Sequence, residues 1–468
     1  MSGLADLEAQ VRRDLAVIDH PDMQWLVPKV GPDGAAALDV LIVGAGQSGT
    51  GVGFGLKRAK VENILLVDRA KRGMEGPWLT FARMKTLRSP KHYTGPDLDV
   101  PSLTYRAWHE ARYGAAAWAE LGLIRREDWA AYLLWVRDAV GLPVRNECEV
   151  VDIAGADGLL AVTLLEGGER RVVHCRKVVL ATGQDGAGRW WMPDFVAGLP
   201  KEVRAHTADA IDFGALKGRT VAVLGTGASA LDNAAEALEA GARVDLFCRR
   251  AMPQLVQPYR WLTFAGFLRH LSDLDDAWRW RFMRTILAQR EGFPQATWDR
   301  CATWPGFRLH TGAGWRGARM REGRVEIDTE KGPFAADFII CGTGIDVDFS
   351  VRPELAGLAG NVASWGDKYQ PPAELRHEAL ARYPYLADDY SLMERVEGVT
   401  PWISDVHLFT IASTMSFGPS GSSINAMTSA VPKLVAGITR GLFRADVERH
   451  WASLMAYDVK QADIGAMA

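Results

Sequence analysis

The sequence predicts an α/β protein with two Rossmann-like dinucleotide-binding domains and a helical, tryptophan-rich insertion. Three observations support this prediction. A short apolar run passes directly into a G-x-G-x-x-G turn, a second unit of the same kind follows later in the chain, and six tryptophans gather within residues 255–315. At 468 residues, the chain is long enough for two or three domains with cores of their own.

The first unit begins with an apolar strand over residues 39–43. Gly44 permits the tight turn, Gly46 lets backbone N–H groups approach a pyrophosphate, and Gly49 lets the following helix pack on the strand. Asp68 ends the next strand, 24 residues after Gly44 (68 − 44), where a carboxylate accepts hydrogen bonds from a ribose diol. A nucleotide site is therefore favoured over a glycine-rich structural turn. Its expected members are Gly44, Gly46, Gln47, Ser48, Gly49, Asp68, Trp78 and Gly183.

The second unit repeats this pattern with a strand over residues 219–224 and an alanine-rich helical run after the turn. Arg249 follows the next strand at the same spacing that separates Asp68 from Gly44. A guanidinium there suits a 2′-phosphate, which a carboxylate would repel. We therefore expect FAD in the first unit, with NAD as the alternative, and NADPH in the second. A solvated strand end is the alternative interpretation of the two arginines. The expected members are Gly225, Gly227, Ser229, Ala230, Arg249, Arg250 and Gly344.

Composition excludes several classes of function. The net charge of −3 gives no reason to expect nucleic acid or an anionic membrane as a partner. The amino terminus has no apolar signal region, and no apolar run approaches the roughly 20 residues that span a bilayer. The cysteines are scattered singly, which argues against disulfide-reductase chemistry and against a metal site. Reduced thiols of this kind predict a cytoplasmic protein.

The order of the segments predicts the domain boundaries. Residues 1–205 and 345–468 form the expected FAD-binding domain, and residues 206–344 form the expected NADPH-binding domain. The second domain includes the insertion at residues 255–315. Its tryptophans either cover a substrate pocket or form the core of a helical subdomain, and the sequence favours neither.

A glycine- and serine-rich stretch precedes the last long helical run. A helix N-terminus presented by Ser422 would stabilise negative charge on a reduced flavin, and an ordinary capped helix is the equal alternative.

The order of these motifs resembles that of the class B flavin-dependent monooxygenases, which include flavin-containing monooxygenases, Baeyer–Villiger monooxygenases and N-hydroxylases. Besides the nucleotide motifs, the resemblance rests on the segments 76–78 (Gly-Pro-Trp) and 89–91 (Ser-Pro-Lys). The family fingerprint F-x-G-x-x-x-H is incomplete. Counting back from His206, Pro200 stands at its phenylalanine position and Glu202 at its glycine position. The subclass therefore stays open.

The resemblance implies the reaction. NADPH passes hydride to FAD, the reduced flavin adds dioxygen at C4a, and the (hydro)peroxyflavin transfers one oxygen atom to a small organic substrate. Arg88 and Lys91 are candidate catalytic partners of the oxygenated flavin, with a salt-bridged loop as the alternative. His206 is a candidate for NADP contact or a domain hinge, although a lone histidine is more often structural.

Two other functions fit the same motifs: a flavin reductase or NADPH oxidase without oxygen insertion, and a nucleotide-binding protein without turnover. The sequence leaves the substrate open among an amine, a sulfide, a ketone and a heteroaromatic ring such as a purine. A homodimer is an expectation from the family alone.

Overall fold

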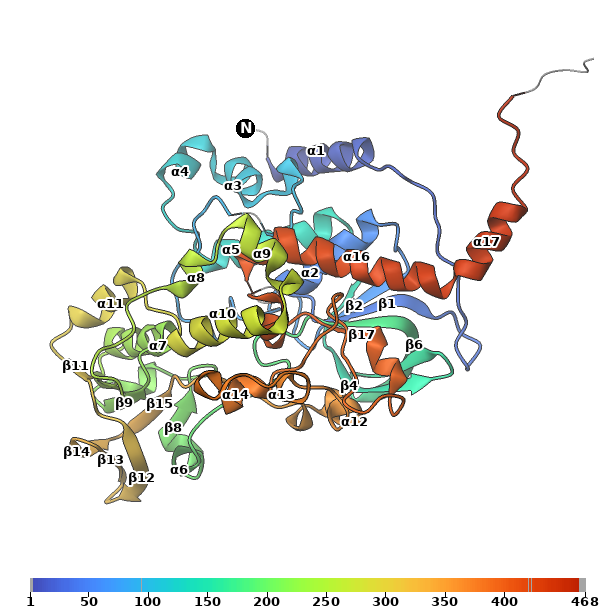
Figure 1. The fold of residues 1–468 in the computed structure, drawn as a ribbon. Coiled ribbons are helices and arrows are strands. Elements are labelled where there is room, and N and C mark those ends of the chain that lie inside the picture. The colour runs from blue at the N-terminus through green and yellow to red at the C-terminus, as the bar shows by residue number, and fades with distance from the viewer. Residues whose placement is uncertain (1–2, 94, 420, 422, 463–468) are drawn as a thin grey trace, which may run out of the picture.

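The computed structural model describes residues 3–93, 95–419, 421 and 423–462 (Figure 1). Two largely separate sheets, each with a run of parallel strands, form its two halves, with helices packed around them. This arrangement confirms the predicted α/β fold with two Rossmann-like domains and a helical, tryptophan-rich part.

The first sheet has the strand order β3-β2-β1-β6-β5-β4, with β17 beside β6. Its middle is parallel, because Ile42 of β1 pairs with Leu66 of β2 on one side and Val179 of β6 on the other. Both faces of these strands are buried, as expected for continuous branched apolar runs. The strands are β1 (Leu38–Val43), β2 (Ile64–Val67), β3 (Val144–Arg145), β4 (Cys148–Ala156), β5 (Leu159–Glu166), β6 (Glu169–Leu180) and β17 (Val406–Leu408).

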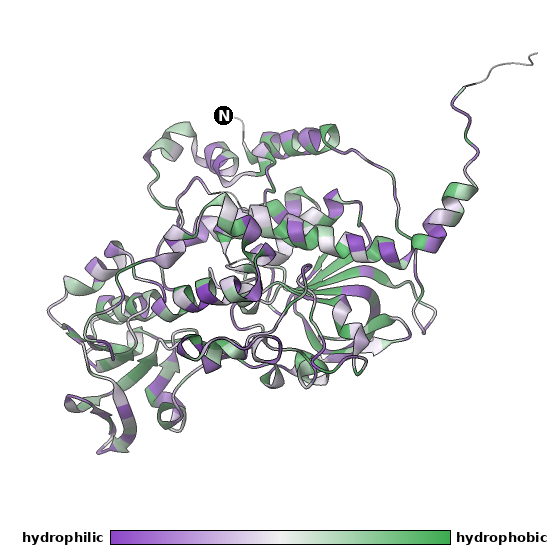
Figure 2. Ribbon diagram, in the orientation of Figure 1, coloured by the Kyte–Doolittle hydropathy of each residue, from purple (hydrophilic) through white to green (hydrophobic). Residues whose placement is uncertain are grey.

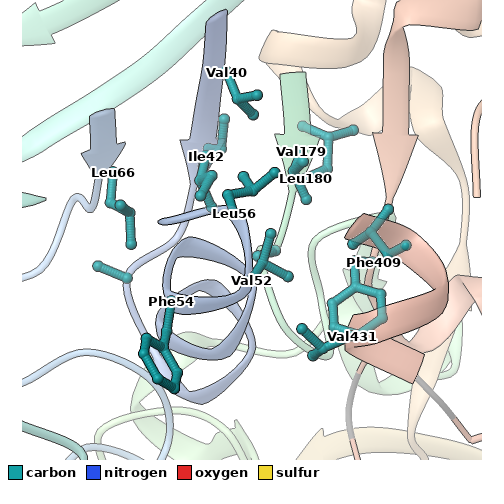
Figure 3. Close-up of a cluster of buried hydrophobic side chains, with 14 of the residues drawn as sticks. Val40, Ile42, Val52, Phe54, Leu56, Leu66, Val179, Leu180, Phe409 and Val431 are labelled. Carbon is teal, nitrogen blue, oxygen red and sulfur yellow. The ribbon is translucent and has the colours of Figure 1, made fainter. Parts of the chain in front are cut away.

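Two helices cover one face of this sheet. Helix α2 (Gln47–Arg58) follows the first glycine-rich turn, and α16 (Met427–Ala445) packs against it. Val52 of α2 and Val431 of α16 lie in one buried cluster with the strands (Figure 3). In Figure 2 the strands in the middle of this sheet are mostly green, the colour of hydrophobic residues, whereas purple hydrophilic and green hydrophobic residues alternate along the outer helices. Helix α2 is thus held by apolar packing between the sheet and α16.

The second sheet has the order β11-β10-β9-β15-β8 and is parallel throughout. Helix α7 (Ala228–Glu239) follows β9 and packs against α11 (Gln295–Ala302). The strands are β8 (Arg204–His206), β9 (Thr220–Leu224), β10 (Arg243–Phe247), β11 (Phe307–His310) and β15 (Phe338–Cys341), and β12 (Trp315–Arg321), β13 (Arg324–Thr329) and β14 (Gly332–Ala336) form a separate antiparallel sheet beside them.

The two chain passages between the halves lie side by side. Strand β7 (Gly188–Trp190) leaves the first half, β16 (Ile345–Val347) returns to it, and the two pair antiparallel, with Trp190 opposite Ile345. The paired passages form a two-stranded connection between the two nucleotide units.

The insertion forms the core of a helical subdomain, with some tryptophans left at its surface. Trp280 is 1% exposed, packs on Trp365 with ring centroids 6.0 Å apart, and donates its indole N–H to the carbonyl of Leu375. Trp261 and Trp278 are exposed. The helices are α8 (Pro258–Trp261), α9 (Ala265–His270), α10 (Asp276–Gln289) and α11, whereas β11 belongs to the second sheet. Helical structure therefore ends earlier than residue 315.

The remaining helices pack outside the two sheets. In the described part of the chain, none of the helices is long and apolar enough to cross a membrane. They are α1 (Leu4–Val17), α3 (Tyr105–Tyr113), α4 (Ala115–Glu120), α5 (Arg126–Ala139), α6 (Asp194–Ala197), α12 (Ala356–Ala359), α13 (Trp365–Lys368), α14 (Glu378–Ala381), α15 (Thr414–Phe417) and α17 (Val447–Met455).

Candidate active site

A cavity of about 470 Å³ crosses the boundary between the two halves. One end lies along the first glycine-rich turn, and the other reaches helix α7 of the second unit. This volume is in the range of small-molecule and cofactor sites. Among its lining residues are Gly44, Gly46, Gln47, Ser48, Asp68, Trp78, Arg88, Gly183, Ser229, Asp232 and Asn233. None of the residues 255–315 lies in its wall, so the tryptophan-rich insertion does not cover this cavity.

Two glycines of the first turn, Gly44 and Gly49, have no room for a side chain. Gly44 has a φ of +99°, and a Cβ there would lie 2.4 Å from the carbonyl oxygen of Ala181. A Cβ on Gly49 would lie 1.8 Å from the carbonyl oxygen of Gly44, because helix and strand touch at this point. Gly46 caps α2 with extended backbone and faces the cavity. The helix start and the bare turn together fit the pyrophosphate of a dinucleotide such as FAD.

Asp68 is held in place by two backbone N–H groups. Its Oδ2 accepts from Ala45 N and its Oδ1 accepts from Ala70 N, both at 2.8 Å. Burial raises the pKa of Asp68 above its usual value, against the lowering effect of these two bonds. Each oxygen keeps a second lone pair, so the carboxylate is oriented and still able to accept from ribose hydroxyls.

The neighbours of this turn are fixed by long-range contacts. Trp129 Nε1 donates to Gln47 Oε1 at 3.1 Å, and Ser48 Oγ donates to the carbonyl of Gly421 at 2.8 Å. Trp78 lies in the wall of the cavity, and its indole N–H has no hydrogen-bond partner among the described residues. Gly183, with a φ of +79°, lines the cavity at the end of β6.

The second turn follows the same design. Gly225 has a φ of +109°, and a Cβ there would lie 2.5 Å from the carbonyl oxygen of Gly342. Gly227 caps α7, and a Cβ there would meet no atom within 4 Å. Ala230 is fully buried against Gly342, so it supports helix–strand packing instead of facing a ligand. Gly344 lies outside the cavity wall, and its carbonyl accepts from Trp191 N at 2.9 Å.

The two arginines after β10 differ in their contacts. Arg250 donates to the carbonyls of Ala288 and Gln289 at the end of α10, at 3.0 and 3.3 Å. Arg249 is exposed and makes no hydrogen bond or ion pair within the described residues. Both lie outside the cavity wall, at the strand end where the ribose of a second nucleotide would sit. Arg249 is the freer of the two to bind a phosphate.

Of the two candidate catalytic residues in the segment 85–92, Arg88 and Lys91, the structure brings only Arg88 to the cavity. Arg88 Nη2 donates to Asp232 Oδ2 at 2.9 Å. Lys91 Nζ donates instead to the carbonyls of Trp118 and Leu121, both at 2.6 Å, and lies 4.7 Å from the ring centre of Trp118. Lys91 is absent from the cavity wall, so its contacts are those of a loop anchor.

His206 lies behind the cavity. It is 1% exposed, its Nδ1 accepts from Ala208 N at 3.2 Å, and burial lowers its pKa to about 4. The imidazole is therefore neutral at physiological pH. Thr207 and Ala208 line the cavity, whereas His206 itself does not. Ser422 falls outside the described residues.

Asp232 and Asn233 are two buried polar wall residues that sequence reasoning missed. They are 3% and 2% exposed, on the side of α7 that faces the first half. The available signal was two adjacent polar residues early in an alanine-rich helical run, on a turn whose neighbours are alanine and leucine.

Thiol chemistry has little support in this cavity. Cys148 is the cysteine in its wall, and burial raises its pKa, which keeps it a thiol. All five cysteines are free and buried. Among the described residues, no group of three or more His, Cys, Asp or Glu is placed to hold a metal ion.

Comparison with known proteins identifies the family. Residues 41–263 match the family model described as pyridine nucleotide-disulphide oxidoreductase. The chain is 38% identical over 459 residues to the FAD-dependent urate hydroxylase of Xanthomonas campestris pv. campestris, covering 97% of this chain and 96% of that protein. The chain belongs to the class B FAD-dependent monooxygenases. The resemblance of the sequence motifs to this family is thereby confirmed.

Solved structures of other flavin enzymes share the fold of this monooxygenase. An ornithine N-hydroxylase from Kutzneria sp. 744 has a TM-score of 0.67 at 17% identity, covering 86% of this chain and 99% of its own. An L-lysine 6-monooxygenase from Pseudomonas syringae has a TM-score of 0.64 at 18% identity, with the same coverage. A bacillithiol disulfide reductase from Bacillus cereus has a TM-score of 0.55 at 15% identity and also covers 86% and 99%. At these identities the likeness concerns the fold alone.

Proposed function

We propose that this monooxygenase uses FAD and NADPH to hydroxylate urate or a closely related oxidised purine. The observation that carries the proposal is the relationship to a urate hydroxylase, at 38% identity over 97% of the chain. The cavity supports it, because one continuous space joins the first glycine-rich turn to helix α7 of the second unit. Such a space brings a flavin, a nicotinamide and a small substrate together.

The two units divide the cofactors between them. FAD is held by the first glycine-rich turn and Asp68, in a domain formed by residues 1–205 and 345–468. NADPH is held by Gly225, Gly227 and Arg249, in a domain formed by residues 206–344. When bound, the flavin supplies two-electron transfer from NADPH and activation of dioxygen. One atom of dioxygen would then enter the substrate, and the other would be released as water, with two electrons and one proton from NADPH and a second proton from solvent.

The residues of the chain position the reactants and limit water. Arg88 places a positive charge at the boundary between the units, and Asp232 fixes its direction. Trp78, Phe81 and Trp190 supply apolar area to the same wall, which lowers the access of water. Lys91 acts indirectly, by tying the segment 85–92 to the end of α4. The ring of His206 packs on the ring of Trp190, with the two centroids 5.1 Å apart, and so supports strand β7 of the connection between the two units.

A cytoplasmic location is part of this proposal. NADPH is a cytoplasmic reductant, and the free cysteines suit a reducing compartment. A homodimer remains an expectation from the family.

The test begins with the FAD-loaded protein under anaerobic conditions. We expect NADPH to bleach the flavin much faster than NADH does. Subsequent mixing with oxygenated buffer and urate should consume urate and place one atom of ¹⁸O₂ in the product, measured by mass spectrometry. Release of one hydrogen peroxide per NADPH, with urate unchanged, would support the reductase or oxidase alternative instead.

A further inference from the structure

Four buried polar atoms in residues of the cavity wall have no hydrogen-bond partner among the described residues: Trp78 Nε1, Arg88 Nε, Thr182 Oγ1 and Asn233 Oδ1. Two of them, Asn233 Oδ1 and Arg88 Nε, belong to residues at the Arg88–Asp232 ion pair. Asn233 lies on α7 and is 2% exposed. Its Nδ2 donates to the carbonyl of Ser229 at 2.9 Å. Because only an N–H group can donate to that carbonyl, the amide has one orientation and Oδ1 is its free end. Asn233 therefore offers a buried acceptor.

The guanidinium of Arg88 is held from the opposite half of the cavity. Nη2 donates to Asp232 Oδ2 at 2.9 Å, and Nη1 lies 3.6 Å from Glu291 Oε2. Asp232 directly precedes Asn233, so the anchor of Arg88 and the free acceptor come from the same turn of α7. The third donor nitrogen, Nε, is shielded from solvent without an acceptor. Buried donors and acceptors left unpaired are unfavourable, and a ligand that pairs both relieves this cost.

We propose that Asn233 Oδ1 and Arg88 Nε recognise one cyclic-amide edge of the substrate. Asn233 accepts a hydrogen bond from a ring N–H, and Arg88 donates one to a neighbouring ring carbonyl. The inference rests on the proposed function, because an oxidised purine such as urate carries alternating N–H and carbonyl groups around its rings. A simple amine, sulfide or ketone does not offer this pair of groups. The two residues thus determine which substrate class the cavity accepts.

The nicotinamide carboxamide of NADPH has the same donor and acceptor groups. Charge favours the purine, since urate is an anion at neutral pH and the oxidised nicotinamide ring is a cation. The cation of Arg88 attracts the first and repels the second. The experiment therefore includes a separate titration with NADP⁺.

The central measurement is equilibrium binding of urate to the FAD-loaded enzyme without NADPH, followed by the change in flavin absorbance. Asn233→Leu keeps the approximate shape of the side chain and removes the acceptor. We expect at least about a tenfold weaker Kd for urate, with unchanged affinity for NADP⁺. Arg88→Lys keeps a cation opposite Asp232 and removes the Nε donor, and we expect a similar loss. Arg300→Lys is the matched control, because Arg300 also faces Asp232 at 3.6 Å but lies outside the cavity wall.

The monomethyl isomers of urate locate the contact. On the wild type, the isomer whose methyl group replaces the N–H facing Asn233 should bind at least about tenfold more weakly than urate. On Asn233→Leu the same isomer should bind like urate, because the partner is already lost. The methylated isomers also test the proposal on the wild type alone. They therefore still decide it if the Asn233→Leu variant fails to load FAD.

The outcomes separate the two proposals. A wild type that neither binds nor oxidises urate overturns the proposed function, and the subsite with it. A wild type that hydroxylates urate, beside an Asn233→Leu variant with unchanged urate affinity, overturns the subsite alone. If Asn233→Leu and Arg88→Lys bind NADP⁺ more weakly but urate as tightly as the wild type does, the two residues contact the nicotinamide. This result also overturns the proposed urate subsite. Equal binding of all monomethyl isomers by the wild type has the same consequence.

Discussion

Arg88 and Asp232 form an ion pair across the two halves of the molecule, with Nη2 and Oδ2 2.9 Å apart. Asp232 also accepts from Thr297 Oγ1 at 3.3 Å and lies 3.6 Å from Arg300. Arg300 in turn pairs with Glu236, one turn further along α7. This part of the cavity wall is thus a charged junction in which one buried carboxylate holds two arginines from different segments.

Replacing Asp232 by asparagine should destabilise this junction. The two arginines would lose the carboxylate that compensates them, and breaking a buried pair leaves charge unpaired. Because Arg88 is about one-third exposed, solvent screens part of the effect, and we expect a loss of about 1–3 kcal/mol in the free energy of unfolding. Urea denaturation of the FAD-loaded protein measures it. Asp388→Asn, which removes an exposed pair with Arg440, should change stability little, and an equal loss in both variants would contradict the expectation.

Gly49→Ala should abolish tight FAD binding. The new Cβ would lie 1.8 Å from the carbonyl oxygen of Gly44, so strand and helix must separate at the turn. We expect a cost of about 3 kcal/mol or more, together with protein that purifies largely without flavin. The ratio of flavin to protein absorbance and the Tm measure the two effects. Gly317→Ala is the control, since a Cβ there meets no atom within 4 Å, and full flavin content in Gly49→Ala would refute the argument.

Local constraints made the two nucleotide units predictable from the sequence. Gly44 and Gly225 must adopt positive φ at a strand–helix turn, and this requirement appears directly in the residue pattern. Partners distant in sequence have no such signature. Asp232 pairs with a residue 144 positions away, so its role emerges only when the two halves meet.

Side-chain type says little where the hydrogen-bond partner of that side chain is backbone. Lys91 resembles a free cation in a polar loop, yet it binds carbonyl groups, which no residue pattern records. The tryptophans of residues 255–315 posed a similar problem, because a pocket cover and a subdomain core share one composition. Packing decides between the two, and it places Trp280 in a core beside Trp365.

Arg249→Ala should reduce the preference for NADPH over NADH. A charge-assisted contact to a 2′-phosphate is lost, whereas NADH has no such group. We expect KM for NADPH to rise roughly ten- to a hundredfold with KM for NADH unchanged, measured by steady-state flavin reduction. Arg250→Ala should have the smaller effect, because that guanidinium is already bonded to Ala288 and Gln289. A parallel rise for both nucleotides would remove Arg249 from the phosphate site.

His206 should make the fold sensitive to acid. Burial lowers its pKa to about 4, whereas an unfolded histidine titrates near its ordinary value of about 6.5. The unfolded chain therefore binds more protons between these values, so the contribution of neutral His206 is complete above about pH 6.5 and is lost as the pH falls towards 4. The full difference is on the order of 3 kcal/mol. Replacement by glutamine, which can still accept from Ala208 N, should remove this part of the acid dependence.

Urea denaturation of wild type and His206→Gln from pH 7.5 to 4.5 measures that difference. The stability advantage of the wild type should shrink as the pH falls, because only the wild type must protonate this buried ring on unfolding. His407→Gln provides a parallel case, since burial also lowers the pKa of His407 to about 4 and this residue lies outside the cavity wall. Stability curves of wild type and His206→Gln that run parallel over the whole range would show that His206 does not titrate as its burial requires.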